Sequence, residues 1–376
     1  MEILNVANYF STFLTFLYIL VVLSFVRGWY QLRSYKSVSR PGKTPVSIIV
    51  AARNEAENIA KTIEDLLAQD YDPALVEIIF IDDHSTDQTA EIISGYPRIK
   101  LISLQEEKTI NSYKKKAIET AIGGASGQLI LTTDADCRMQ PSWLKTIVSY
   151  YEENDYKMIS SPVLYTDERN FFERAQSLEF LYLIGLGAST IGNNKPSTCN
   201  GANLAYERAA FYEVGGFKGI DDLASGDDEL LLHKMAARYD NKIGFLKNYD
   251  AVVYTQAKPT LSEFIQQRKR WASKSTRYKN KSIIVLGVFV WLFNLSIVLN
   301  LLTGLFIGAF FKVAIIQLAL KIGIEFIFLW DVTKFAKRRE LLVLLPLLNL
   351  MHIVYIIFIG IAGNSGKYNW KGRMVK

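Results

Sequence analysis

The sequence predicts an α/β domain built on a parallel sheet and held between membrane-spanning helices. Three observations predict this fold class. Half of the 376 residues are hydrophobic, yet 21% are charged. The charged residues lie mostly between residues 27 and 281, whereas long uncharged runs occupy both ends of the chain. Within the charged middle, short apolar runs alternate with helix-patterned segments, as in βαβ units.

An apolar run at residues 9–26 approaches the length needed to cross a bilayer. The competing interpretation is a secretory signal, but no Lys or Arg precedes the run and no small-residue cleavage site follows it. Because positively charged flanks stay in the cytoplasm, we expect the N-terminus outside and the middle of the chain inside. The flank, in which no acidic residue occurs, carries Arg27, Arg33, Lys36 and Arg40.

Two more spans are predicted at residues 283–302 and 311–330. The second carries Lys321 and Glu325 one helical turn apart, where they can pair on one face. Ionisable residues inside a membrane are functional candidates by default. We nevertheless favour a self-neutralising pair that faces a neighbouring helix.

The last apolar run, residues 341–363, contains Pro346 and has two interpretations. If it crosses the bilayer once, the basic tail after it lies outside, against the positive-inside rule. We therefore expect the run to re-enter or to lie in the interface, which leaves the C-terminus cytoplasmic. The sequence thus predicts membrane segments at residues 1–44 and 276–376 around a catalytic or binding domain at residues 45–275.

Charge and cysteine usage exclude several classes. The net charge is +6 and the pI about 9.0, but the basic residues cluster beside membrane segments, where anionic lipid explains them better than nucleic acid does. The two cysteines, Cys137 and Cys199, are far apart and lack metal-ligand spacing. Neither a disulfide framework nor a zinc site is predicted.

The middle of the chain predicts four strands whose carboxyl ends carry polar clusters. In open α/β sheets ligands bind beyond these ends. Three clusters facing one edge indicate a site, whereas one alone would be turn chemistry. The strands are expected at residues 46–52, 76–83, 99–104 and 127–136, with helices at 54–70, 85–96 and 112–125; the clusters are Arg53–Asn54–Glu55, Asp82–Asp83 and Asp134–Asp136.

The chemistry of this edge favours a hard cation. A dinucleotide is disfavoured because no glycine-rich GxGxxG turn is present. Asp134 and Asp136, one residue apart, suit Mg²⁺ or Mn²⁺, which bind through one or two carboxylates and substrate phosphates. Such an ion would act as a Lewis acid on a diphosphate leaving group.

The second half of the domain adds three stretches. Residues 197–217 form a small-residue loop that leads to a helix and a Gly-Gly turn. Asp227 and Asp228 stand at a helix start, where N-capping is the plain alternative, above all for Asp227. Residues 268–271, Arg-Lys-Arg-Trp, are either a juxtamembrane basic segment or clamps for a diphosphate.

The chain resembles the membrane-bound glycosyltransferases of family 2 in four stretches that occur in the same order. These stretches are "ARNE", "DDHSTDQT", "DAD", and "DD" followed by "QRKRW". The resemblance covers about residues 45–271, and the last element fully matches the Q(Q/R)xRW pattern. It implies a GT-A, Rossmann-like nucleotide-binding catalytic domain, similar to those of ceramide glucosyltransferases and the cellulose, chitin and hyaluronan synthases.

The resemblance also implies roles for individual residues. Asp228 would be the general base, and Asp136 would bind the metal. Lys114 to Lys116 lie where the family usually has Gly-Lys, so which lysine reaches the nucleotide stays open. The nucleotide-sugar would contact Ala51, Asn54, Glu55, Asp83, Lys114, Lys115, Asp134, Gln267, Arg270 and Trp271, and the acceptor Cys199, Asn200, Gly201 and Trp271, although packing explains Cys199 equally well.

The function expected from this resemblance is inverting transfer from a nucleotide-sugar, UDP-linked, to a lipid-linked or saccharide acceptor. The place would be the cytoplasmic face of a bacterial plasma (inner) membrane. A processive polysaccharide synthase is the alternative, but a polar export pore needs many helices, unless an oligomer assembles one. A transporter with a regulatory domain is disfavoured because it would not explain the ordered motifs. A nucleotidyl transferase is disfavoured because it would need a glycine-rich loop after the first strand, and the sequence has none there.

Overall fold

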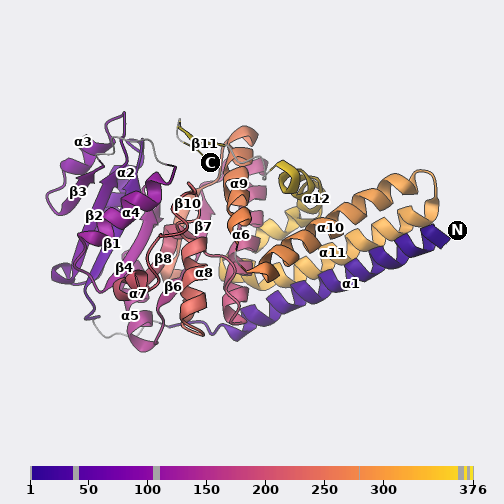
Figure 1. Ribbon diagram of the computed structural model, residues 1–376, viewed down its shortest axis with the longest axis horizontal. Coiled ribbons are helices and arrows are strands. Elements are labelled where there is room, and N and C mark those ends of the chain that lie inside the picture. The colour runs from indigo at the N-terminus through magenta and orange to yellow at the C-terminus, as the bar shows by residue number, and fades with distance from the viewer. Residues whose placement is uncertain are drawn as a thin grey trace.

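The computed structural model describes residues 2–36, 42–104, 111–278, 280–362, 368–370 and 373–375. Figure 1 shows an α/β domain at one end and three long helices that extend from it to the other end, where the N-terminus lies. Arg40 of the basic flank lies outside the described residues.

The centre of the α/β domain is a seven-stranded sheet of order β3-β2-β1-β4-β8-β6-β9. The four strands predicted from the sequence are present, and β1 pairs in parallel with both β2 and β4 while β2 pairs in parallel with β3. The strands are β1 Val46–Ala52, β2 Val76–Asp82, β3 Ile99–Ser103, β4 Leu129–Asp134, β6 Met158–Ser160, β8 Leu204–Glu207 and β9 Ile243–Phe245.

Strand β8 is absent from the sequence prediction, which treated residues 197–217 as a loop before a helix. The strand is antiparallel to both β4 and β6 and joins the two halves of the sheet. Its four residues are too short to show an alternating pattern. A second sheet of order β5-β10-β7 lies beside the first and comprises β5 Arg138–Met139, β7 Val163–Thr166 and β10 Val253–Gln256.

Helices cover both faces of the main sheet, which explains why its parallel strands are apolar without alternation. Even-numbered β1 residues such as Ile48 pack with α2, α3 and α5, whereas Ile49 packs with α4, α7 and α8. The three helices predicted with bounds are confirmed but shorter: α2 Ile59–Leu67, α3 Thr89–Ser94 and α4 Tyr113–Gly123. Helices α7 Arg208–Glu213 and α8 Glu229–Arg238 lie where the sequence predicted helices without bounds, and α5 Trp143–Glu153 was not predicted.

Two further helices, α6 (Phe171–Gly192) and α9 (Leu261–Ser273), lie between the sheets and the long helices (Figure 1). Helix α6 packs on the first long helix at Gly28 and Gly192. A Cβ atom on Gly28 would stand 2.0 Å from the carbonyl oxygen of Ser189, and one on Gly192 would stand 2.2 Å from that of Gly28. The two glycines therefore allow the close approach that fixes the α/β domain on the bundle.

The three long helices correspond to the predicted spans. Four segments of the described chain are long and apolar enough to cross a membrane by length and composition: residues 6–31, 281–304, 308–335 and 339–361. The helices are α1 Glu2–Gln31, α10 Lys281–Gly304, α11 Gly308–Phe335 and α12 Leu345–Ala362. The short 3₁₀ segment η4 (Lys274–Arg277) connects α9 to α10, and η5 (Arg339–Leu344) lies between α11 and α12; the other 3₁₀ segments are η1 Pro73–Leu75, η2 Gly201–Asn203 and η3 Tyr249–Ala251.

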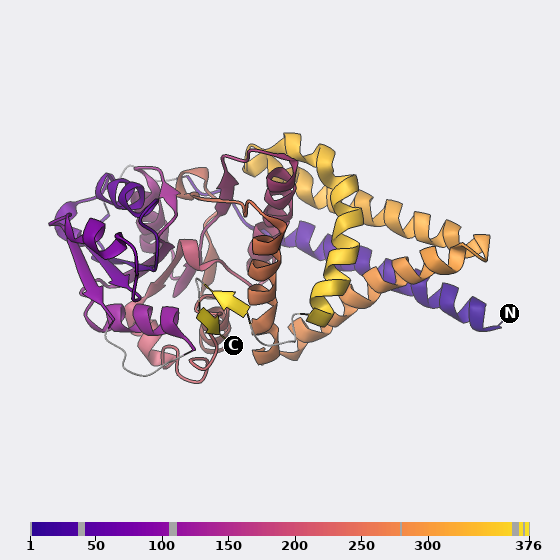
Figure 2. The same ribbon diagram turned by 90° about the horizontal axis from the view of Figure 1, so that it is seen from above.

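Helix α12 differs from the other three in direction. Seen from above, it runs across the long helices rather than along them (Figure 2), and it packs against α9. A short hairpin follows, β11 (Tyr368–Trp370) and β12 (Arg373–Val375), and β11 contacts α9 on the sheet side of the bundle. That the last apolar segment re-enters or lies in the interface, with a cytoplasmic C-terminus, stays a prediction.

The predicted Lys321–Glu325 pair is confirmed inside the bundle. Lys321 Nζ lies 2.6 Å from Glu325 Oε1 and 2.5 Å from Asn349 Oδ1, and Asn349 Nδ2 donates to Glu325 Oε2 at 2.9 Å. The Tyr18 hydroxyl donates to the same carboxylate. The pair therefore ties α11 to α1 and α12, as expected for a neutral pair that faces neighbouring helices.

Glu325→Ala is expected to destabilise the protein by about 3–5 kcal/mol, because it leaves the Lys321 ammonium buried without a counter-charge. Thermal unfolding in detergent measures the loss. The double variant Lys321→Met/Glu325→Leu removes both charges and should recover most of the stability. If Glu325→Ala unfolded at the wild-type temperature, the pair would contribute nothing.

Candidate functional site

A cavity of about 730 Å³ opens at the carboxyl ends of β1, β2 and β4. Parallel register aligns these ends: Ala51 stands opposite Asp134 and Ala52 opposite Asp82. The three strand-end clusters therefore share one edge, as the sequence predicted. Helices α6 and α9, the loop at residues 198–202 and the start of α8 complete the lining.

The loops after β1 and β2 are fastened to each other. The Arg53 guanidinium donates to the carbonyls of Asp83 and His84, each at 2.7 Å. Asn54 has a left-handed backbone (φ 50°), and its Oδ1 accepts from the Thr86 N–H at 2.8 Å. Glu55 and Asp83 consequently line the cavity, whereas Asn54 supports the loop from outside the lining.

Lys114 connects two carboxylates across the cavity. Its Nζ lies 2.7 Å from Asp134 Oδ1 and 3.2 Å from Asp227 Oδ2. Burial alone would lower the pKa of Lys114, but Asp134 and Asp227 raise it above its ordinary value. Lys114 is therefore a fixed cation between the end of β4 and the start of α8.

Lys115 points elsewhere. It is 1% exposed, and its Nζ donates to the carbonyls of Ile220, Leu223 and Ser225 at 2.6–2.7 Å. Burial lowers the pKa of Lys115 to about 8. Of the adjacent lysines left open by the sequence, Lys114 reaches the cavity and Lys115 instead holds the loop that precedes Asp227.

A possible cation site lies at the end of β4. Ligand atoms of Asp134, Asp136 and Cys137 lie within 4.8 Å of one another. Burial raises the pKa of the Cys137 thiol well above its ordinary value, and a sulfur ligand does not suit a hard cation, which prefers oxygen. The two carboxylates fit a hard cation. Asp134 already pairs with Lys114, whereas Asp136 has no ion pair among the described residues.

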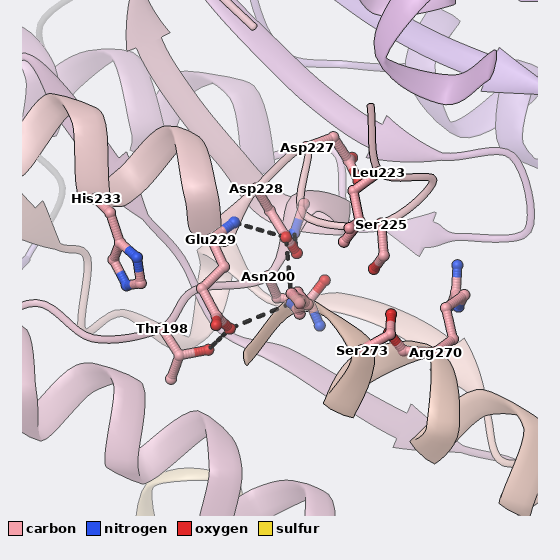
Figure 3. A network of polar contacts seen from close by, with 12 residues as sticks. Thr198, Asn200, Leu223, Ser225, Asp227, Asp228, Glu229, His233, Arg270 and Ser273 are labelled. Atoms are coloured by element: carbon pink, nitrogen blue, oxygen red, sulfur yellow. Dashed lines mark hydrogen bonds and ion pairs between the residues drawn. The ribbon is translucent and has the colours of Figure 1, made fainter. Parts of the chain in front are cut away.

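Asp228 is the N-cap of α8. Its Oδ1 accepts from the Glu229 N–H at 2.6 Å, and its Oδ2 accepts from the Gly201 N–H at 3.1 Å (Figure 3). The capping alternative raised for Asp227 therefore applies to Asp228, while Asp227 pairs with Lys114. A carboxylate has about four acceptor positions, so Asp228 keeps capacity for a proton on the cavity side.

Lys274 controls the charge of Asp228. Its Nζ lies 3.4 Å from Asp228 Oδ1 and 3.2 Å from Glu229 Oε2. Burial alone would raise the pKa of Asp228, but Lys274 and the N–H donors of Glu229 and Gly201 lower it to about 2. The carboxylate is therefore ionised at neutral pH although it is shielded from water.

Glu229 holds Lys274 in place. Its carboxylate accepts from the Thr198 hydroxyl at 2.7 Å and from the Tyr278 hydroxyl. Figure 3 shows Thr198 and Glu229 side by side beneath Asp228. Neither Glu229 nor Lys274 was predicted from the sequence. Helical spacing offered a signal for Lys274, since residues 267, 270, 271 and 274 share one face of a helix.

The two arginines of the basic segment of α9 have different environments. Arg268 is 2% exposed and donates to both Glu179 oxygens, at 3.2 and 2.7 Å. It packs between Phe264 and Trp271, with its guanidinium carbon 4.5 and 4.2 Å from the two ring centroids. Arg268 is therefore not free to clamp a phosphate, which corrects that expectation, whereas Arg270 lines the cavity.

The structure thus brings most predicted residues to one cavity. Asn54 and Lys115 are the two that it leaves outside the lining. Burial and the neighbouring Asp228 raise the pKa of the Cys199 thiol, so it lines the cavity as a neutral group. The predicted residues that line it are Ala51, Glu55, Asp83, Lys114, Asp134, Asp136, Cys199, Asn200, Gly201, Asp228, Gln267, Arg270 and Trp271.

Comparison with known proteins supports the family resemblance noted in the sequence. Residues 47–215 match Glycosyl transferase family 2. A glucosyl-dolichyl phosphate glucuronosyltransferase of Haloferax volcanii is 24% identical over 184 residues, which are 46% of this chain and 56% of that protein. A beta-monoglucosyldiacylglycerol synthase of Synechocystis sp. is 26% identical over 235 residues, 60% of this chain and 47% of that protein. The chain spans about half the length of these relatives.

A solved structure shares the fold over nearly the whole chain. It is a mannosyltransferase from Pyrobaculum calidifontis in complex with GDP-Man and Mn²⁺, with a TM-score of 0.58 at 18% identity. The superposition covers 96% of this chain and 98% of that one. The mixed sheet with its flanking helices is therefore the GT-A fold.

Proposed function

Because this chain carries a glycosyl transferase family 2 domain, we propose that its cavity transfers a sugar from a UDP-linked donor to a hydroxyl acceptor, with inversion. The acceptor is lipid-linked or a saccharide. One observation carries the proposal: a single cavity places Asp83, Asp134 and Asp136 at the strand ends and Asp228 across from them. We propose residues 45–275 as the catalytic domain.

The donor lies along the strand ends in this proposal. Asp83 binds the edge of the base, and Lys114 and Arg270 face the diphosphate with their positive charge. Asp136, with Asp134 beside it, would hold Mg²⁺ or Mn²⁺, which supplies Lewis-acid stabilisation of the leaving diphosphate when bound. Gln267 and Trp271 close the cavity from α9.

Transfer itself requires a base on the acceptor side. Asp228 takes the proton of the acceptor hydroxyl as that oxygen attacks the anomeric carbon. The bond to the diphosphate breaks on the opposite face, so the configuration inverts. The hydrogen bonds from Gly201 and Glu229 orient the carboxylate.

Lys274→Gln is expected to make activity sensitive to acid. In the wild type, Asp228 stays ionised down to a pH near its pKa of about 2. Without the ammonium, the largest group that offsets burial is gone and the pKa of Asp228 rises, so the ionised base is lost at a higher pH than in the wild type. The pH profile of transfer from about pH 8 to pH 5 measures the effect. Lys242→Gln, at a surface pair with Asp155, is the control. If both variants lost activity at the same low pH, the role of Lys274 would be contradicted.

The membrane arrangement supports a lipid-linked acceptor over polymer export. The interior of the helix bundle is filled by buried side chains, among them Phe293, Gln317 and Phe328. A polar export pore through one copy would have to displace them. We propose that α1, α10 and α11 cross the membrane with the N-terminus outside, so that the α/β domain faces the cytoplasm.

Thermal unfolding of the detergent-purified protein with UDP or GDP, in manganese and then in chelator, tests the donor assignment. A manganese-dependent rise in unfolding temperature with UDP, and a smaller one with GDP, is expected. A larger rise with GDP would replace the uridine assignment. No rise with either nucleotide would contradict the proposed function.

A further inference from the structure

An apolar groove of about 250 Å³ lies on the bundle side of α6 and α9, against α12. It is separate from the cavity that faces the sheet. Its lining is almost entirely hydrocarbon and aromatic, with Phe172 from α6, Phe264 and Ile265 from α9, and Leu348, Tyr355 and Phe358 from α12.

The mouth of the groove is apolar, which fits a bilayer better than water. Helix α12 lies across the base of the long helices (Figure 2), and its outward side chains Leu350, Met351 and Val354 are 45–65% exposed. An exposed apolar surface of this kind marks a contact with a membrane or with another apolar partner, and the adjacent long apolar helices favour a membrane. At the rim, Lys269 Nζ lies 5.9 Å from the ring centroid of Phe358, so a cation stands where head groups begin.

The wall between groove and cavity is about one side chain thick. Gln176 lines the groove, and its amide makes two hydrogen bonds to the backbone of Lys258, at 2.8 and 3.1 Å; Lys258 lines the cavity. Glu179 lines the groove and is held by Arg268, next to Gln267 of the cavity. Arg268 and Glu179 neutralise each other, so the pair closes the bottom of the groove and does not bind a ligand.

One face of α6 runs from the groove to the cavity. Residues 172, 176 and 179 line the groove, and residues 180, 184 and 187 continue at helical spacing along the cavity. From residue 176 to 184 the helix rises about 12 Å. Helix α6 therefore provides a surface that connects the groove with the cavity.

We propose that the groove holds one hydrocarbon chain of the lipid acceptor, and that α6 guides its neutral, hydroxyl-bearing head to Asp228. This inference rests on the proposed transfer reaction. An uncharged head fits the acceptor end of the cavity, because Lys274, the lysine beside Asp228, is already shared by two carboxylates. A hydroxyl needs a base there, whereas an anionic head would meet Asp228 and Glu229.

Photolabelling of the full-length protein in nanodiscs tests the groove. The probes are a diacylglycerol and a phosphatidylcholine that carry the same diazirine in one acyl chain. Irradiation expels N₂, and the carbene inserts into a nearby C–H bond that peptide mass spectrometry can locate. Diacylglycerol is expected to label groove peptides of α6, α9 and α12 several-fold more than phosphatidylcholine.

A pair of variants sharpens the test. Met351→Trp, at the exposed mouth, should cover the groove and reduce its labelling several-fold. Val288→Trp, on the exposed face of α10, is the matched control and should change nothing. Equal labelling by both lipids would make this a bulk-lipid site, and labelling spread evenly over α10 and α11 would exclude a site; either result overturns the proposal.

UDP-induced thermal stabilisation, measured on the same samples, separates the two proposals. Donor binding without selective groove labelling overturns the acceptor groove alone. Selective labelling without donor binding contradicts the transfer reaction and, with it, the acceptor role of the groove.

Discussion

Asp228→Asn is expected to bind the donor and lose about 10²–10⁴-fold in transfer rate. The amide cannot accept the proton of the acceptor hydroxyl. It also has one acceptor oxygen for two donors, because the N–H groups of Gly201 and Glu229 bond different oxygens of Asp228. The loss of one such bond costs about 0.5–1.5 kcal/mol of stability, which is small beside the loss in rate.

Turnover and donor affinity, measured on the same preparation, check this expectation. Asp222→Asn is the control, since Asp222 lies on the same loop, is 52% exposed and pairs with Arg277 at the surface. It should keep wild-type turnover. Full turnover in Asp228→Asn would show that another group takes the proton.

Asp136→Ala is expected to abolish the manganese-dependent part of donor affinity. Asp136 is the carboxylate of the β4 end without an ion pair among the described residues, whereas Asp134 is neutralised by Lys114. Without Asp136 the site keeps one carboxylate that a lysine already occupies, and a hard cation needs more oxygen ligands than that.

Titration of UDP with and without manganese measures the effect, and Asp70→Ala, at an exposed pair with Lys145, is the control. In the variant, the two titrations should coincide at the weak affinity seen for the wild type in chelator. A manganese response of wild-type size would remove Asp136 as the ligand.

The sequence predicted best those strands and helices whose positions follow from their own local composition. Strand β1 is a run of seven residues of which six are buried, and the polar residues that follow it mark where the sheet edge lies. The long helices are set by length and hydropathy, so their predicted positions differ from the observed ones by only a few residues at each end.

Contacts between distant segments could not be predicted in the same way. Lys114 and Lys115 are adjacent and chemically identical, so the sequence does not distinguish them. Packing of α4 against the loop at residues 220–225 places Lys114 at the cavity and Lys115 against backbone carbonyls of that loop. Likewise, Lys274 acquires its importance from Asp228, 46 residues earlier, and no local pattern connects the two.

The direction of α12 also depends on distant contacts. Its composition fits a transmembrane span, and its length is sufficient. Packing against α9 and the bond from Asn349 to Glu325 instead set it across the bundle.

Nucleotide release by the detergent-purified protein, measured across a panel of UDP- and GDP-sugars, tests the central claim most directly. Each sugar is assayed with manganese and then with chelator. Manganese-dependent release from one UDP-sugar, lost in Asp136→Ala, is the predicted result and would also name the donor. No release and no binding of any nucleotide-sugar would contradict the assignment of this cavity to glycosyl transfer.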